Sequence, residues 1–465
     1  MKYFVGVFAI TITILFSGVI KAEYGQCPVG HCGAKSALIK KVCDSKKLAV
    51  AFLEYNNDFC WCACSCVAGD TIVSLPGNKT KSMSEFKISD KVMVLSNGKW
   101  KAKTVTYSGA GGPEPERPYP YAVYIEVSNG SSIITTSDHA FLLSNKKLKR
   151  ADRLTPHDIL LDPRLGELTI KKLRVGSYMG RLANISTDAP RGGDYEGHII
   201  STNNILSGDF YAQNNLVPQI WLKEPQIGTT EYRNKYQNSD AIDGESLDEK
   251  IDFGDGKYFE PYKNAIIPSN AVSYLPPQNE EPIRELLAPL DSSVPYEIAE
   301  YIVWQYKRFY PDIKFEIHWT DERVNAYAWI QNGNRHVALL GGLIRHTYVK
   351  KEAVGLVLAH EMGHHYGGEP KYPNNPWASC EGQSDYWGAL VAERVVWWGP
   401  ESLRQIKEGG KQLFDLFSGG LASGNLLASP TANKVACSHP PAYCRLQTYQ
   451  AAARMDEKPT CAAVN

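Results

Sequence analysis

One short stretch constrains this chain more than any other: residues 356–365 run Leu-Val-Leu-Ala-His-Glu-Met-Gly-His-His. The apolar lead-in predicts a helix, and Gly367 predicts where it ends. Residues four apart share one face of a helix, so His360 and His364 can direct ring nitrogens at one metal ion. Glu361 can then reach a water bound to that ion. The pattern predicts a zinc hydrolase centre.

The length and charge of the chain limit the kinds of protein that it can be. With 465 residues, the chain has room for two or three domains, each with its own core. It carries 50 basic and 50 acidic residues, and this balance argues against a nucleic-acid-binding protein. Only eleven residues are histidines, so the zinc motif would arise by composition on the order of once in a hundred such chains.

Residues 1–22 have the pattern of a secretory signal peptide. Lys2 precedes an uncharged apolar run that ends at Ile20, and Ala22 supplies a small residue before a cleavage point. An uncleaved membrane anchor is the alternative, because the run is long enough to span a bilayer. We expect a secreted or periplasmic protein, with no stable membrane insertion once the signal is removed.

The cysteines fall into two groups. Of the eleven, six lie between Cys27 and Cys64 and four between Cys380 and Cys461. In an exported chain these predict disulfides. If each group pairs within itself, Cys66 is left over.

Residues 23–65 form a cysteine-rich segment before the first predicted domain. Helical periodicity covers residues 34–55, whereas cysteines alternate with other residues from 60 to 66. In an extended chain, that alternation would place four sulfurs on one face. A metal site is one interpretation, and disulfides are the favoured one.

Residues 66–216 contain short β-like runs separated by turns. Three of them are residues 71–75, 91–95 and 121–127, and Asn-Gly pairs follow the last two. These features predict an all-β domain.

The same region resembles the Hint family, which includes inteins and hedgehog autoprocessing domains. It opens on Cys-Val-Ala-Gly-Asp-Thr at residues 66–71 and contains Thr-Ser-Asp-His at 136–139. It closes on Asn-Ile-Leu-Ser-Gly-Asp-Phe-Tyr-Ala-Gln-Asn at 204–214. The resemblance implies a domain that cleaves its own chain.

The Hint resemblance also implies residue roles. Cys66 would attack the preceding carbonyl and convert the peptide bond into a thioester. Thr136 and His139 would distort and protonate that bond, and Asn214 would cyclise to cut the bond that follows it.

Two residues depart from the intein pattern. Gln213 stands where inteins usually keep an assisting histidine, and Asn215 stands where splicing needs Cys, Ser or Thr. We therefore expect autocleavage at Ser65–Cys66, and slower cleavage after Asn214, rather than splicing. An inert Hint fold is the alternative.

The rest of the chain divides at about residue 285. Residues 217–285 lose periodicity and are rich in Asn, Tyr, Pro, Gly and Asp, which predicts a linker or propeptide. Residues 286–465 mix a helix that starts near Pro295 with strands at 314–319 and 335–340. The expected fold is therefore multidomain, an all-β Hint domain followed by an α+β zincin-type metallopeptidase domain.

The zinc site needs a third protein ligand beside its water. His365 adjoins the motif, but it would project about 100° around the helix from His364. Glu381 is the better candidate, because it shares a helix face with Asp385, one turn away. Glu381 would bind zinc, and Asp385 would hold the second ring nitrogen of a motif histidine.

The second domain resembles the gluzincin peptidases related to the CAAX prenyl proteases. Its blocks are Asn-Ala-Tyr-Ala at 325–328, the zinc helix, Glu381 with Asp385, and His-Pro-Pro-Ala-Tyr-Cys-Arg at 439–445. The resemblance implies that His439 faces the developing oxyanion and that Arg445 orders the site. It also implies that the strand at residues 337–340 pairs with an extended substrate.

A protein or peptide is the expected substrate. Zinc would acidify its water and polarise the peptide carbonyl, while Glu361 would move the proton to the leaving amine. Two alternatives keep parts of this interpretation. One is a secreted toxin or effector that its Hint domain releases, and the other is a catalytically quiet, chaperone-like module that binds peptides along the strand at 337–340.

Overall fold

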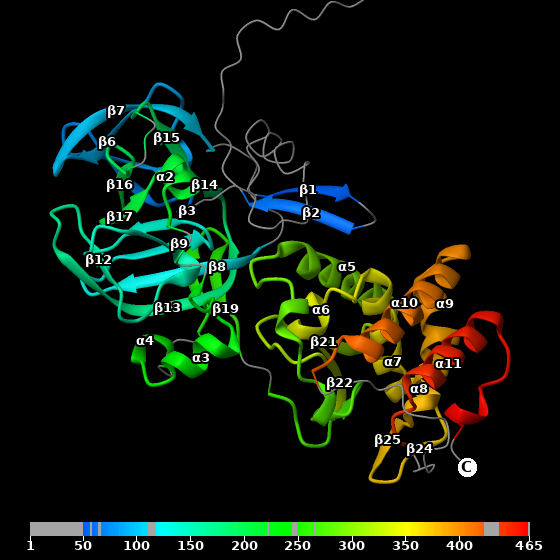
Figure 1. The fold of residues 1–465 in the computed structure, drawn as a ribbon. Helices are drawn as coiled ribbons and strands as arrows, with labels where there is room; N and C mark the ends of the chain where they lie inside the picture. Colours follow the sequence, from blue (N-terminus) through cyan, green and yellow to red (C-terminus); the bar gives the residue numbers. More distant parts are fainter. Residues whose placement is uncertain are drawn as a thin grey trace, which may run out of the picture.

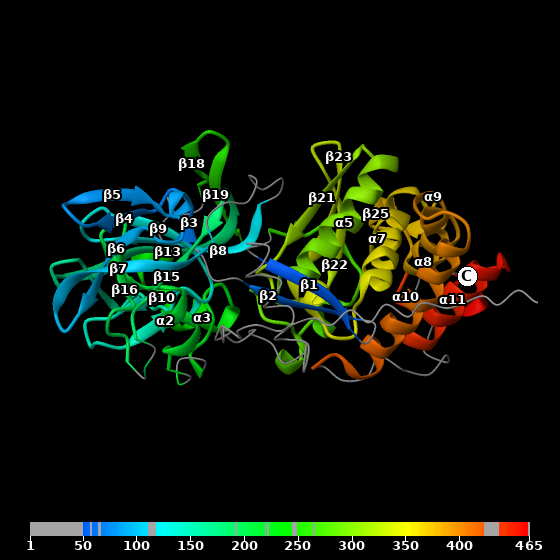
Figure 2. The same ribbon diagram turned by 90° about the horizontal axis from the view of Figure 1, so that it is seen from above.

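The computed structural model describes residues 50–55, 58–63, 67–109, 118–190, 192, 194–218, 220, 223–243, 249–263, 266–422 and 437–463. The expected signal peptide and Cys66 lie outside these residues. Figure 1 shows an all-β half and a half built from helices around a small sheet, and Figure 2 shows them side by side from above.

Two antiparallel sheets make up the first half. One has nine strands: β4 (Ile72–Leu75), β5 (Lys79–Ser82), β6 (Lys91–Ser96), β7 (Lys99–Ser108), β10 (Ala140–Leu142), β11 (Leu148–Arg150), β15 (Ile185–Thr187), β16 (Ile199–Thr202) and β17 (Ile205–Gly208). The other has eight: β3 (Val67–Ala68), β8 (Tyr119–Val127), β9 (Ser132–Thr136), β12 (Ile159–Leu161), β13 (Glu167–Met179), β14 (Leu182–Ala183), β18 (Ile251–Gly254) and β19 (Lys257–Pro261).

Local sequence explains the hairpins. Between β6 and β7, Asn97 and Gly98 both have positive φ, which a two-residue turn of this kind requires. The apolar strand β8 pairs with β9 and β13 and is almost wholly buried. The three runs expected at residues 71–75, 91–95 and 121–127 all become strands, and the first half is all-β, as predicted.

Three short helices follow β17, before the chain returns to the first half in β18 and β19: α2 (Phe210–Asn215), α3 (Thr230–Tyr236) and α4 (Asp240–Asp243). Single-turn 3₁₀ helices occur at Met83–Glu85, Ala151–Arg153, Pro277–Asn279, Arg284–Leu286 and Thr460–Ala462. A separate hairpin joins β1 (Val50–Tyr55) to β2 (Asp58–Ala63).

The second half has a four-stranded sheet in the order β20-β22-β23-β21. These strands are β20 (Val272–Ser273), β21 (Ile313–His318), β22 (Ala326–Gln331) and β23 (Asn334–Leu340), and a hairpin of β24 (Lys371–Tyr372) and β25 (Asn375–Ser379) lies apart. The helices are α5 (Ser293–Phe309), α6 (Gly341–Arg345), α7 (Lys351–Tyr366), α8 (Glu381–Trp387), a π-helical turn (Gly388–Ala392), α9 (Glu393–Val396), α10 (Pro400–Gly419) and α11 (Ala442–Arg454).

Helix α7 is the central element of this half. It packs against α5, α8, α10 and strand β22, and its residues 352–364 are all buried. A helix that is buried all round needs mostly apolar or small residues, and the buried polar residues of α7 are Glu352 and the three of the zinc motif, His360, Glu361 and His364. At Gly363, an added Cβ would lie 2.6 Å from the backbone of Ser384. This glycine therefore lets α8 approach α7 closely.

Two expectations differ from the structure. The described end of the helix expected over residues 34–55 is strand β1, because its residues pair along β2 rather than forming a helix face. Residues 217–285 are not a featureless linker, since they form α3, α4, β18, β19 and β20. Each of these elements is too short to show periodicity in the sequence. Strand β19 pairs with the longer strand β13, and β20 pairs with the longer strand β22.

Candidate metal centre and processing site

Three side chains from two helices meet at the centre of the second half. His360 and His364 come from α7, and Glu381 is the first residue of α8. One donor atom from each lies within 4.8 Å of the others. Glu381 Oε2 is 3.3 Å from His360 Nε2, and Glu381 Oε1 is 3.6 Å from His364 Nε2. The structure thus brings together the three predicted ligands.

Hydrogen bonds orient both rings. His360 Nδ1 donates to Asp385 Oδ1 at 2.8 Å, and His364 Nδ1 donates to the carbonyl oxygen of Ser379 at 2.8 Å. With both Nδ1 atoms engaged, each Nε2 faces the other ligands. Outer partners of this kind fix the ring that binds a metal.

Asp385 is in turn held by a buried cluster. Arg445 donates to it from two nitrogens, with a shortest distance of 2.7 Å, and Tyr449 donates its hydroxyl proton at 2.6 Å. Arg445 also lies over the ring of Tyr274. The expected supporting pair, Asp385 and Arg445, therefore exists as a direct contact.

The donor set fits zinc. His360 Nε2, His364 Nε2 and Glu381 Oε2 are buried and have no hydrogen-bond partner among the described residues. Leaving such atoms unpaired costs free energy unless something else binds them. Two imidazoles and one carboxylate are the ligands of a catalytic zinc site that leaves its fourth position open.

Burial and charge separate the pKa values in this cluster. Burial alone would lower the pKa of His360, but the charge of Asp385 and its hydrogen bond raise it to about 9. Burial lowers the pKa of His364 to about 3. Burial would raise the pKa of Glu381, yet the charges of His439 and His364 hold it well below its ordinary value.

Glu361 is the neighbouring carboxylate in the motif. It is fully buried, and neither of its oxygens has a hydrogen-bond partner among the described residues. Burial raises the pKa of its carboxyl to about 8. Such a carboxyl can take up and release a proton near neutral pH.

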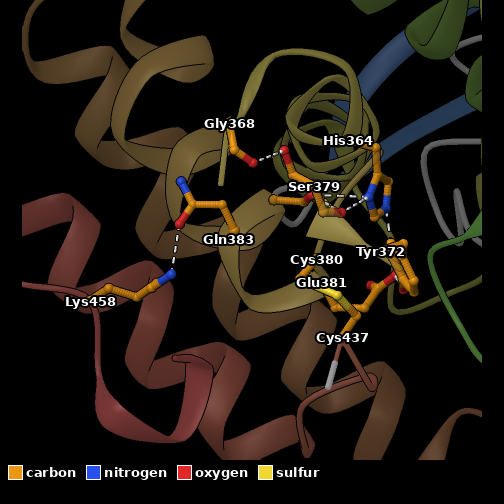
Figure 3. Close-up of a disulfide and its surroundings, with 10 residues drawn as sticks. His364, Gly368, Tyr372, Ser379, Cys380, Glu381, Gln383, Cys437 and Lys458 are labelled. Carbon is orange, nitrogen blue, oxygen red and sulfur yellow. Dashed lines mark hydrogen bonds and ion pairs between the residues drawn. A yellow bond between two sulfur atoms is a disulfide. The ribbon is translucent and has the colours of Figure 1, made fainter. Parts of the chain in front are cut away.

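The rim of the site contains two further groups. His439 Nε2 is 3.7 Å from Glu381 Oε1 and donates to the carbonyl oxygen of Ser273 at 2.8 Å. Tyr372, which the motifs did not reveal, donates its hydroxyl proton to Glu381 Oε1 at 2.6 Å (Figure 3). Tyr372 lies in the β24–β25 hairpin, where no helical or strand spacing links it to the zinc motif.

His365 points away from the centre, as its helical angle predicts. Its Nε2 lies 3.0 Å from the carbonyl oxygen of His336, and its ring stacks on Trp377.

The strand expected to pair with substrate is not an edge. Residues 337–340 belong to β23, which pairs with β21 on one side and with β22 on the other. No backbone group of β23 is left to add a peptide strand, so this expectation was wrong, both for a substrate and for a chaperone-like module. The side of β22 that does not pair with β23 is paired with β20.

Disulfides fasten the elements that carry the site. Cys380, next to Glu381, bonds to Cys437, two residues before His439 (Figure 3). Cys444 bonds to Cys461. The C-terminal group of four cysteines therefore pairs within itself, which is the condition under which Cys66 is left over.

In the first half, two of the predicted processing residues lie close together in the chain: Thr136 is the last residue of β9, and His139 follows it before β10. The backbone of β3 pairs Val67 with Thr135, the residue before Thr136. Thr136 Oγ1 donates to Asp138 at 2.8 Å. Asn214 lies in α2, after the residue that contacts His139. Cys66 itself falls outside the described residues.

The contact to His139 comes from Gln213, one of the two residues that depart from the intein pattern. Gln213 Nε2 donates to His139 Nδ1 at 2.7 Å, and its Oε1 accepts from Asn184. Burial lowers the pKa of His139 to about 3, so the ring is neutral and carries its proton on Nε2. That atom is buried and has no partner among the described residues, so it can donate a hydrogen bond.

The solved structures to which the N-terminal region is similar include inteins and an intein-like domain. The DnaB intein from Synechocystis sp. PCC 6803 is 15% identical, with a TM-score of 0.25 over 31% of this chain and 98% of that one. The bacterial intein-like domain from Clostridium thermocellum is 21% identical, with the same TM-score and coverage. No curated protein matches significantly. Among the described residues, no helix has the length and apolar character needed to cross a membrane.

The model of peptidase family M48 matches residues 298–372. This segment runs from α5 through β21, β22, β23 and α7 to β24, and the match supports a metalloprotease. The second domain is therefore of the M48 peptidase type, in agreement with the gluzincin motifs of the sequence, and it follows an all-β domain that carries the Hint motifs.

Proposed function

We propose that the chain is an exported zinc metalloendopeptidase whose Hint domain cleaves itself at Ser65–Cys66, and more slowly after Asn214. This cleavage matures or releases the peptidase. Two disulfides in the described part of the chain and the apolar N-terminal run support export.

One observation carries the peptidase proposal. His360, His364 and Glu381 present unpaired donor atoms to one point, and Glu361 presents an unpaired carboxyl beside them. Buried polar atoms without partners are rare in proteins, and a cluster of them on four neighbouring residues is rarer still.

The chemistry follows from these residues. A zinc ion held by His360, His364 and Glu381 would supply a Lewis acid that polarises a peptide carbonyl and acidifies water. Glu361 takes the proton of the attacking water and passes it to the leaving amine. His439 offers its Nε2–H to the carbonyl oxygen as negative charge develops there. The substrate is a protein or peptide.

Metal analysis tests the ligand set. The purified chain should contain about one zinc per molecule, and His364→Ala should lose it, because three protein ligands are needed for tight binding. His365→Ala is the matched control, since His365 adjoins the motif but bonds to His336 instead. If His365→Ala loses zinc as completely as His364→Ala, the assignment fails.

The processing proposal has a separate test. The wild-type chain should yield two fragments that separate at Ser65–Cys66, because a thioester there is open to water or thiols. Cys66→Ala should remain whole at that bond. An unchanged band pattern in Cys66→Ala, checked by intact mass, would exclude self-cleavage by this cysteine.

A further inference from the structure

Strand β20 covers the edge of β22 that faces the candidate metal centre. Val272 pairs with Ala328 and Ser273 with Tyr327, antiparallel. The backbone N–H of Tyr274 extends this ladder by donating to Ala326 O at 2.9 Å. Beyond it, the side-chain amide of Asn325 donates to Leu275 O and accepts from Leu275 N.

The other side of this segment contacts the candidate catalytic groups. Bonded and non-bonded pairs alternate in antiparallel ladders, so Ser273, between two bonded positions, directs its N–H and C=O away from β22. Its carbonyl oxygen accepts the 2.8 Å hydrogen bond from His439 Nε2. That nitrogen lies 3.7 Å from Glu381 Oε1. A peptide carbonyl of this chain therefore occupies the Nε2–H of His439 that the proposed function assigns to a substrate carbonyl.

Tyr274 anchors the segment. It is fully buried, its ring packs edge-on against His360 and beside Phe417, and its carbonyl oxygen accepts from Arg445 at 2.8 Å. The segment is thus an extended peptide with one aromatic side chain inserted next to the site.

The same stretch leads back to the first half of the molecule. Strand β19 precedes it by ten residues and pairs with β13 of the eight-stranded sheet. Residues 266–275 are therefore tethered to the Hint domain at one end and to the peptidase domain at the other.

We propose that residues 270–280 act as an internal blocking peptide, which occupies the peptide-binding edge of β22 and keeps the peptidase latent until it is displaced. Of the two proposed cuts, the one after Asn214 would leave β19 held to β13 by non-covalent contacts alone and so would loosen the tether. The proposal rests on the proposed peptidase function. It also defines the ligand of this edge: an extended peptide, antiparallel to β22, with an aromatic residue beside His360.

A proline at position 272 tests the proposal. Val272 occupies a bonded position, so Val272→Pro removes its strand hydrogen bond and weakens the pairing. Ser269→Pro is the matched control. It adds a proline at the second position of the turn closed by Ala271 N to Pro268 O, where proline is tolerated.

The readout is binding of a fluorescent synthetic peptide with the sequence of residues 268–281 to the zinc-loaded full chain. Val272→Pro should bind it at least roughly tenfold more tightly than the wild type, because the internal segment competes less well. Ser269→Pro should match the wild type. Equal binding by a folded Val272→Pro and the wild type would overturn the proposal.

A second variant covers the case in which Val272→Pro does not fold. Residues 263–269 are replaced with a site for a sequence-specific protease, and peptide binding is compared before and after the cut. Binding that appears only after the cut supports the blocking segment, and binding that the cut does not change refutes it. If binding increases without hydrolysis of any unstructured protein, the blocking role stands and the peptidase function fails.

Discussion

Arg445 illustrates how single side chains hold the candidate centre. Its guanidinium is buried, bridges Asp385 and Tyr274, and so fixes the ring of His360 through Asp385. The sequence predicted this role through the resemblance, because an arginine six residues after His439 belongs to the family's motif. It did not predict Tyr449, which completes the same cluster from α11 and has no motif of its own.

Replacing Arg445 should therefore weaken zinc binding without touching a ligand. Arg445→Lys keeps the charge but loses the planar fork that holds Asp385. We expect zinc affinity to fall by roughly 10- to 100-fold, the usual effect of losing an outer partner. Competition with a chelator measures it. Arg454→Lys is the control, because Arg454 lies on the same helix as Arg445 but forms an exposed ion pair with Asp456. It should leave the zinc affinity unchanged.

At the scale of elements, helix α9 buries an ionisable group that the zinc site does not use. The hydroxyl of Tyr306 in α5 lies 3.0 Å from Glu393 Oε1 and 3.0 Å from the carbonyl oxygen of Gly355 in α7. When Glu393 is protonated, the carboxyl can donate to the hydroxyl, which then donates to Gly355. The three helices thus meet at one hydroxyl. Burial raises the pKa of Glu393 to about 8.

This carboxyl should make stability depend on pH. Unfolding returns the pKa of Glu393 to its ordinary value of 4.5, so between that pH and about 8 only the folded state keeps the proton. The contribution is complete at low pH and is lost as the pH rises toward 8. Between pH 5 and pH 8, the free energy of unfolding should fall in the wild type by on the order of a few kcal/mol more than in Glu393→Gln. Urea unfolding near pH 5 and near pH 8 measures this difference. A slope equal to that of the wild type would contradict this account of Glu393.

Elements with long periodic patterns were predictable, and short ones were not. The apolar spacing after Pro295 predicted α5, and the run before His360 predicted α7. Strand β20 has two residues and exists only because β22 offers an open edge. No local pattern can encode such a strand, because its stability comes from a partner far away in the sequence.

At the scale of the whole molecule, the two halves are linked by more than the chain. Ser137, inside the predicted processing block, donates to Asp291 of the second half at 3.0 Å, and Gln226 bridges Asp291 to Asp152. Motifs predicted both domains, because the candidate site residues of each are close in sequence or at fixed spacing. The contacts between domains join residues with no such spacing, so only the folded chain reveals them.

The most direct test of the account measures hydrolysis of an unstructured protein by the zinc-loaded full chain. In the Val272→Pro background, the account predicts hydrolysis that the wild type shows only weakly, and Glu361→Gln in that background should abolish it while zinc stays bound. Hydrolysis that persists with Glu361→Gln, or a folded and zinc-loaded Val272→Pro protein that cleaves nothing, would contradict the central claim.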